Sequence, residues 1–341
     1  HPQAPQSLFD RTILAIEAVT QLAKFLTDAF QIYDLNFSKS LVTNYLNESH
    51  KMMKHALVDF PLGDARAQIV MKDESRIRVH VEMTGEKVLM DFTGTSTSRK
   101  MNLTDSAAFG ACFGALVSLF DQGLPINAGS FQILEVRSPT GSLLNAKYPS
   151  PTFLGMTDGV ALTANLVLGA LGQVIPKKLM APTYPGQCAL DLEFDGGLHF
   201  FDTVAPGVGA STTARGEDGM HFWIRSPLQA SIEEIEKRFP MRIGTVAIRQ
   251  GSGGKGQHKG GDGLMKTFEL TAAAQVRWAL GPAIKMEGSE GGAGGAEPEI
   301  IFVFADGGKE KGESYGHRRL EAGDTIMIHS AGGASHGHSK A

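Results

Sequence analysis

The first sixty residues carry apolar side chains at helical spacing. Apolar positions recur every three or four residues with charged residues between them, as at Leu8, Ile13, Ile16, Leu22, Phe25 and Leu26. A second helical pattern runs from Ser38 to Val58 and stops before Pro61 and Gly63, residues that break helices. The pattern predicts a pair of amphipathic helices within residues 1–62.

The spacing of apolar residues changes after residue 62. Ile77, Val79 and Val81 alternate with charged residues, which is typical of a strand with one buried face. Residues 87–92 predict a second strand, and the small and apolar residues of 107–120 and 153–176 predict two buried helices. We therefore expect a mixed α/β region over residues 63–190.

Beyond residue 190 the pattern becomes short apolar runs separated by glycines. Strands are predicted at residues 198–201, 245–248, 299–304 and 325–329, and one short helix at residues 231–238. The whole chain is therefore predicted to be α+β, with an N-terminal helical pair, a mixed α/β centre and a glycine-looped, β-rich C-terminal region at 191–341. Two organisations fit this pattern: separate domains at 63–190 and 191–341, or one continuous domain.

Composition sets limits on the partners. The chain has 341 residues, of which 42% are apolar and 20% charged, and this composition favours a packed core over disorder. The net charge of −4 gives no reason to expect nucleic acid or an anionic membrane as a partner. The longest apolar stretch, at residues 160–175, contains Thr163, Asn165 and Gln173, so it is too short and too polar to span a bilayer.

The two cysteines exclude a disulfide framework and a zinc site built from several thiolates. They favour a reducing compartment, and we expect a cytoplasmic protein. His329, His336 and His338 in the tail could suggest a zinc site. A glycine-rich terminus is more often frayed, so we predict a disordered tail and no metal ligand there.

Glycine is enriched, at 41 residues, and one glycine segment spells the pattern GxGxxG at residues 251–256. A dinucleotide site would need a helix directly after this pattern, but more glycine follows instead. A Walker A loop is also excluded, because Gly256 follows Lys255 where Ser or Thr is required. We expect a loop between strands and no ATP-binding loop, although Lys255 and His258 could bind a phosphate.

The densest polar cluster lies at residues 211–221 and contains Arg215, Asp218 and His221. Asp218 could orient the His221 imidazole for proton transfer, and Arg215 could bind an anionic group of a substrate. The alternative is an ordinary solvated loop in which His221 packs beside Phe222 and Trp223.

The order of several short motifs carries a family resemblance. In chain order they occupy residues 91–96, 102, 124–129, 141–145, 168–171, 209–210, 218–221, 251–256, 259–263, 322–324 and 332–333. This series resembles the hydantoinase B/oxoprolinase family, and the resemblance covers nearly the whole chain. Each motif is weak alone, but their common order is specific.

The resemblance implies a subunit of an ATP-dependent enzyme. In such systems a hydantoinase A-type partner uses ATP and Mg to phosphorylate a carbonyl substrate, and the B-type subunit acts on the activated product. The first hypothesis is a hydrolase of cyclic amides such as hydantoins or oxoproline, working in a hetero-oligomer. The alternatives are an acetone or acetophenone carboxylase type of subunit, and a non-catalytic structural part of a larger complex.

Three departures from the family bear on the site. The family's metal-associated His/Asp residues belong to a segment that precedes the first residue here, so no metal ligand is expected in this chain. The family's Asn-Val-Glu-Thr-like stretch corresponds to residues 155–159, where Asp158 either replaces the acid or caps the next helix; capping is predicted. After His221 the residues are more apolar, which suits a more hydrophobic substrate or indicates a degenerate site. The resemblance implies catalytic roles for His221 and Asp218.

Overall fold

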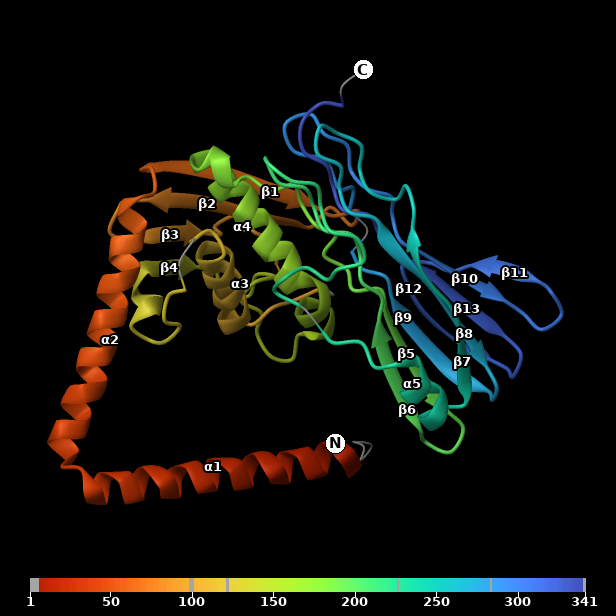
Figure 1. Cartoon of the computed structure of the whole chain (residues 1–341), viewed down its shortest axis with the longest axis horizontal. Helices are drawn as coiled ribbons and strands as arrows, with labels where there is room; N and C mark the ends of the chain where they lie inside the picture. The colour runs from red at the N-terminus through yellow and green to blue at the C-terminus, as the bar shows by residue number, and fades with distance from the viewer. Residues whose placement is uncertain (1–5, 98–100, 121–122, 226, 283, 340–341) are drawn as a thin grey trace. The chain divides into compact units, whose positions relative to one another are not determined.

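The computed structural model describes residues 6–97, 101–120, 123–225, 227–282 and 284–339. The chain divides into two compact units, one made of His1–Ala56 with Gly123–Ile133 and the other of Leu57–Gln122 with Leu134–Ala341. Helices come first and antiparallel strands predominate toward the C-terminus, which confirms the predicted α+β class (Figure 1).

The first unit is built on the two predicted helices, α1 (Gln6–Ile32) and α2 (Leu35–Val58). The Asn127 amide donates to Ser49 Oγ on α2 at 2.8 Å, and Asn127 Oδ1 accepts the Gly129 N–H at 2.9 Å. A Cβ at Gly129 would lie 2.0 Å from the Leu46 carbonyl oxygen, so glycine is required for this close approach. These contacts fasten residues 123–133 to α2.

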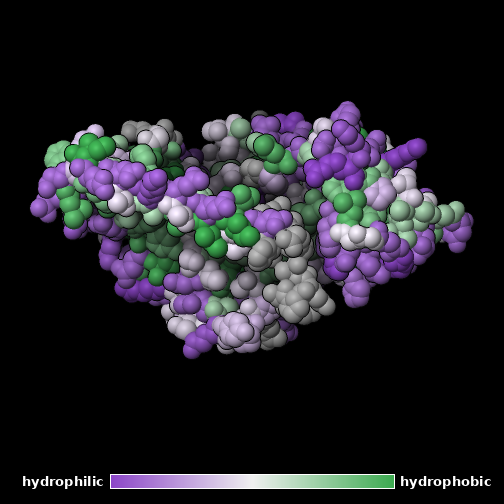
Figure 2. Space-filling view, turned by 90° about the horizontal axis from the view of Figure 1, so that it is seen from below, coloured by the Kyte–Doolittle hydropathy of each residue, from purple (hydrophilic) through white to green (hydrophobic). Residues whose placement is uncertain are grey.

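Large apolar side chains are exposed on α1. Leu14, Val19 and Phe25 are 63%, 66% and 67% exposed. On the face of the molecule drawn in Figure 2, apolar and hydrophilic side chains are interleaved. Exposed apolar surface of this kind is typical of a region that contacts another protein.

The second unit begins with a four-stranded sheet in the order β1-β2-β3-β4. Its strands are β1 (Gly63–Val70), β2 (Arg76–Met83), β3 (Val88–Asp91) and β4 (Leu134–Arg137), antiparallel except for the β3–β4 pair. The apolar positions of β2 alternate into the core as predicted. The helices α3 (Asp105–Val117) and α4 (Val160–Val174) pack together, and α4 contacts β1 and β2.

Two antiparallel sheets of the same unit share one hydrophobic core. One has the order β12-β9-β5-β6, from Tyr315–Leu320, Ala274–Ala279, Ala189–Phe194 and His199–Thr203. The other has the order β11-β10-β13-β8-β7, from Lys309–Lys311, Glu299–Val303, Thr325–His329, Gly263–Leu270 and Met241–Arg249. Leu192, Val276 and Phe268 meet in the core, and Ile235 of α5 (Ile232–Arg238) is buried there too.

The GxGxxG segment connects β7 to β8, which are antiparallel neighbours. The prediction of a loop between strands is therefore confirmed. The loop packs against other glycine-rich segments backbone to backbone. A Cβ at Gly207 would lie 1.9 Å from the Gly261 carbonyl oxygen, and a Cβ at Gly333 would lie 2.0 Å from that of Val208. The surplus glycine thus serves close backbone packing, since no other residue fits at these distances.

The predicted disorder of the C-terminal tail is wrong. Ser330, Ala334 and Ser335 are fully buried. The Gly333 N–H donates to the Gly261 carbonyl at 2.9 Å, and the Ala334 N–H donates to the Pro182 carbonyl at 3.1 Å. The tail is ordered because it supplies backbone partners to the glycine-rich segments that precede it in the chain.

Two expectations from the sequence concern residues that the structure describes. One is that the apolar stretches do not span a bilayer, and the other is that the two cysteines do not form a disulfide framework. None of the helices within the described ranges is long and apolar enough to cross a bilayer. Both Cys112 and Cys188 are buried free thiols.

Candidate functional site

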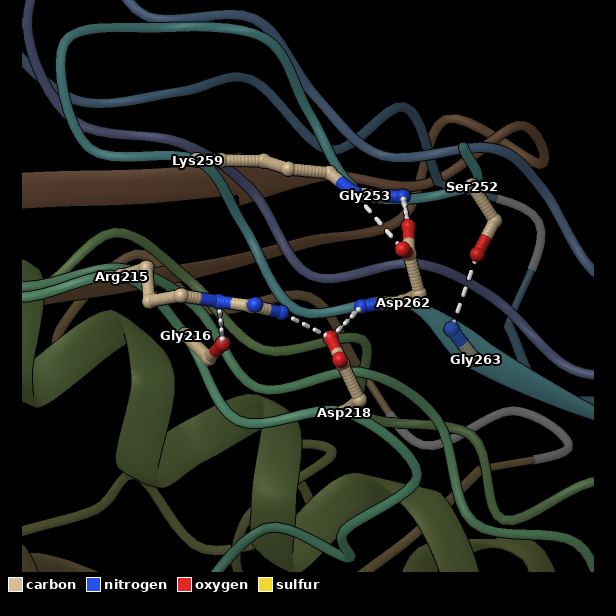
Figure 3. Close-up of polar contacts among 8 residues, drawn as sticks. All are labelled: Arg215, Gly216, Asp218, Ser252, Gly253, Lys259, Asp262 and Gly263. Carbon is tan, nitrogen blue, oxygen red and sulfur yellow. Dashed lines mark hydrogen bonds and ion pairs between the residues drawn. The ribbon is translucent and has the colours of Figure 1, made fainter. Parts of the chain in front are cut away.

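A polar network surrounds the glycine loop and joins three chain segments (Figure 3). Asp262 is its centre: Oδ1 accepts the Gly253 N–H at 2.7 Å, and Oδ2 accepts a hydrogen bond from Lys259 Nζ at 2.6 Å. Burial acts to raise the pKa of Asp262, but the Lys259 ammonium and backbone amides outweigh it and hold the pKa below its usual value. Asp262 is therefore a charged anchor of the loop.

Arg215 and Asp218 belong to the same network. The Arg215 guanidinium forms a close ion pair with Asp218 Oδ1, and that oxygen also accepts the Asp262 N–H at 2.7 Å. The Arg215 Nε donates to the Gly216 carbonyl at 3.2 Å. The structure thus brings the predicted Arg215 and Asp218 together, and an anion at Arg215 would compete with Asp218.

His221 has different partners from those predicted. Its Nε2 lies 3.2 Å from Thr203 Oγ1, and within the described part of the chain no hydrogen bond or ion pair joins it to Asp218. Burial lowers the pKa of His221, while the negative charge of Asp202 acts to raise it. The imidazole is therefore buried and neutral at pH 7. The expected orientation of His221 by Asp218 is not the one observed, and a catalytic role for either residue stays a prediction.

A buried ion pair lies beside His221. Lys266 Nζ donates to Asp202 Oδ2 at 2.6 Å and to Gln229 Oε1 at 3.0 Å. The side chains of Lys266 and Asp202 are only 6% and 12% exposed. The charge of Asp202 that acts on His221 is therefore largely compensated by Lys266.

Lys255 and His258 lie in the glycine loop between β7 and β8. Lys255 is exposed, and its carbonyl accepts the Ser335 hydroxyl at 2.8 Å. His258 pairs through its backbone with His336, and their ring centroids are 6.3 Å apart. Among the residues that the structure describes, no three His, Cys, Asp or Glu side chains are grouped as metal ligands.

Asp158 is a further candidate, for which the sequence predicts a helix-capping role. It lies in the π-helical turn Gly155–Gly159 before α4, and no side chain caps this turn or the start of α4. The predicted capping role is therefore wrong. Asp158 is 1% exposed, and the Tyr315 hydroxyl donates to its Oδ2 at 3.3 Å. π-Helical turns occur frequently at functional sites.

The surroundings of Asp158 change its protonation. Burial raises the pKa of Asp158 to about 7, although the Tyr315 hydrogen bond and the positive charge of Arg225 act to lower it. Burial and the Asp158 charge raise the pKa of Tyr315 well above its usual value. Asp158 thus exchanges a proton near neutral pH, a property shared by many catalytic carboxyls.

Tyr315 also lines a cavity of about 850 Å³. The wall is largely apolar and includes Met101, Leu143, Phe153, Leu154, Trp278 and Pro282. Arg277 lines it too, but its guanidinium is held by Asp191 at 3.0 Å and Glu193 at 2.7 Å. A large apolar cavity beside a perturbed carboxyl is a candidate substrate site.

Comparison with known proteins gives one family. The Hydantoinase B/oxoprolinase family model matches residues 14–339. The chain is 25% identical over 264 residues to the B-type subunit of a putative D-/L-hydantoinase of Pseudomonas sp. (strain NS671), covering 70% of this chain and 44% of that protein. The curated relatives that it matches are longer, and the chain spans less than half of their length.

Two solved structures share the fold. One is the ATP-dependent caprolactamase of Pseudomonas jessenii, with a TM-score of 0.79 and 19% identity, covering 93% of this chain and 58% of that chain. The other is acetone carboxylase in its nucleotide-free form, with a TM-score of 0.76 and 12% identity, covering 92% of this chain and 50% of that chain.

Proposed function

Because the chain belongs to the hydantoinase B/oxoprolinase family, we propose that it is the B-type subunit of an ATP-dependent cyclic-amide hydrolase. In this proposal, an A-type partner uses ATP and Mg to phosphorylate the carbonyl oxygen of the substrate. This chain then opens the ring of the activated amide with water. The relative named as a hydantoinase subunit and the fold shared with an ATP-dependent caprolactamase support this assignment.

One observation supports assigning ATP to the partner subunit and not to this chain. Several amides of the glycine loop are already bonded within the chain: Gly253 donates to Asp262, Gly254 to Gly333 and Gly261 to Val208. A loop that cradles phosphates needs backbone N–H groups directed at the ligand. The segment with the strongest nucleotide-like pattern is a packed structural element, so the proposal assigns ATP to the partner.

We assign the candidate residues as follows. His221 is the proposed proton acceptor for the attacking water, and the lowered pKa that keeps its imidazole neutral supports this role. Arg215, Lys255 and His258 are proposed to bind an anionic group such as the phosphate of the activated substrate. Asp218 positions Arg215 through their ion pair and does not orient His221 in this scheme.

A hetero-oligomer is part of the proposal. Leu14, Val19 and Phe25 expose apolar side chains on α1, and the relative in Pseudomonas sp. is itself named as a subunit. Covering such residues in an assembly would remove apolar surface from water, which favours association.

The substrate class is tested with the complete assembly of the proposed A-type and B-type subunits. We expect hydantoin, 5-oxoproline or 2-pyrrolidone to stimulate ATP consumption without bicarbonate, because hydrolysis requires only water as the second substrate. The measurement is ADP release with each compound. The shared fold with acetone carboxylase favours one alternative. ADP release that requires a ketone together with bicarbonate, and is absent with every cyclic amide, would select that carboxylase reaction instead.

A further inference from the structure

The Asp158–Tyr315 pair is a polar group to which the proposed function gives no role. Asp158 comes from the turn before α4 and Tyr315 from the edge strand β12, and the hydroxyl-to-carboxyl distance is 3.3 Å. The turn is fixed in place: a Cβ at Gly155 would lie 1.8 Å from the Asn102 carbonyl oxygen, and Gln187 Nε2 donates to the Thr157 carbonyl at 3.1 Å. The carboxyl is therefore held against the hydroxyl by rigid neighbours.

Tyr315 connects this buried carboxyl to the cavity. Asp158 is 1% exposed, so it reaches no ligand itself, whereas Tyr315 is 37% exposed and lines the cavity wall. A ligand in the cavity can therefore reach Tyr315, and Asp158 acts on such a ligand only through the tyrosine.

The cavity lining indicates the class of ligand. Four charged residues line the cavity: the basic residues Lys72 and Arg277 and the acidic residues Asp73 and Asp191. Arg277 is already bonded to Asp191 and Glu193, so a carboxylate on a ligand would have to displace them. Much of the remaining wall is apolar. The lining suits an uncharged ring more than a carboxylated one.

This inference rests on the proposed function. We propose that the cavity binds a cyclic amide whose ring carries no charged substituent, and that the Tyr315 hydroxyl, backed by Asp158, protonates the ring nitrogen of the activated amide during ring opening. Tyr315 is then a catalytic residue, and Asp158 is the positioning residue that supplies the proton through it.

The proton balance is as follows. Water adds to the carbonyl carbon of the activated amide and loses two protons, the first to His221, the proton acceptor of the proposed function, and the second to bulk water as the C=O bond re-forms. The ring C–N bond breaks, its electron pair goes to nitrogen, and the carbonyl carbon is left as an acyl phosphate. A second water hydrolyses the acyl phosphate to a carboxylate and inorganic phosphate.

In the structure Tyr315 donates to the Asp158 carboxylate. Once Asp158 is protonated this hydrogen bond reverses, and the tyrosine hydroxyl is free to donate to the ligand. Nitrogen then takes the Tyr315 hydroxyl proton while the protonated Asp158 carboxyl passes its own proton to the tyrosine oxygen. Asp158 ends as a carboxylate, which the positive charge of Arg225 stabilises, and it takes up a proton from water before the next turnover. The relay uses Asp158 because the raised pKa of Tyr315 makes a free tyrosinate unfavourable.

Tyr315→Phe in the complete assembly tests the relay, with Tyr148→Phe as the matched control because Tyr148 is 98% exposed. We expect Tyr315→Phe to lower kcat for 2-pyrrolidone opening about 100-fold, within the usual range for a lost general acid. Tyr148→Phe should leave kcat unchanged. Equal activity of the two variants would overturn the relay.

The pH profile separates proton supply from a merely structural role. Asp158 must be protonated to supply the proton, so the wild-type rate should fall as the pH rises through about 7. Asp158→Asn should lower the rate and remove this limb, so that the rate no longer falls as the pH rises through about 7. A wild-type profile without a limb near pH 7, or the same limb in Asp158→Asn, would contradict the role of Asp158.

Binding distinguishes failure of this inference from failure of the proposed function. We expect calorimetry to show 2-pyrrolidone binding to the purified chain, about fivefold weaker in Tyr315→Phe through loss of one hydrogen bond. We expect 5-oxoproline, the same ring with a carboxylate, to bind at least about tenfold more weakly. Binding with these differences but no ring opening by the assembly would overturn the proposed function and retain the cavity as a lactam site. Ring opening with no effect of Tyr315→Phe on binding or rate would overturn only this inference.

Discussion

Gly261→Ala is expected to lower the free energy of unfolding by about 3–5 kcal/mol, or to prevent folding. The added Cβ would lie 1.9 Å from the Glu217 carbonyl oxygen and 2.9 Å from the Val208 nitrogen, both of which are backbone atoms. Gly261 also donates its N–H to Val208 and accepts one from Gly333, so the backbone cannot move away without breaking these bonds. Chemical denaturation of the purified variant measures the loss.

Gly110→Ala is the matched control for this substitution. Gly110 lies within α3, and a Cβ there would meet nothing within 4 Å. Alanine is the better helix former, so we expect a gain of about 0.5–1 kcal/mol. If Gly261→Ala behaved like Gly110→Ala, the glycine segments could not be packed backbone to backbone as described.

Lys266→Ala is expected to cost about 3–5 kcal/mol of stability, because it leaves the buried Asp202 carboxylate without its cation. Lys266 Nζ lies 2.6 Å from Asp202 Oδ2, and both side chains are largely buried. Urea denaturation measures the loss. The exposed Lys237 of α5 gives the control, since Lys237→Ala should change stability by less than about 0.5 kcal/mol.

The same variant reports on His221. Without Lys266, the uncompensated charge of Asp202 favours the imidazolium form, so the pKa of His221 should rise. If His221 is the proton acceptor, the acid limb of the pH–rate profile should move to higher pH, and NMR titration of the imidazole gives the pKa directly. The double variant Asp202→Asn/Lys266→Met removes both charges and should recover much of the stability. An unchanged acid limb despite a raised pKa of His221 would contradict the role of His221.

Local sequence patterns predicted the helices and some of the strands, but not β5, β8, β9 or β12. The alternation at Ile77, Val79 and Val81 predicted β2, because a strand with one buried face imposes a period of two on its side chains. The tail was mispredicted for a physical reason. Its glycines pack on segments more than seventy residues away, such as Gly333 on Gly261, and a local pattern contains no information on a non-local backbone contact.

The candidate site was only partly accessible from the sequence. Arg215 and Asp218 are three residues apart and do meet, since a short loop brings such neighbours together. His221 is equally close to Asp218 in sequence, but its imidazole faces Thr203. Asp158 and Tyr315 are brought together from opposite parts of the chain by the packing of the π-helical turn near β12. In the sequence, the feature that distinguishes Asp158 is that it is a single acidic residue at the start of an apolar, buried helix.

The central claim is that the partner activates the substrate and this chain opens the ring. The most direct measurement is the yield of ring-opened product from a cyclic amide and ATP, with the A-type subunit alone and after addition of this chain. We predict no ring-opened product from the partner alone, and one ADP formed per ring opened once this chain is present. Ring opening by the partner alone at the rate of the complete assembly would contradict the claim and identify this chain as a non-catalytic part of the complex.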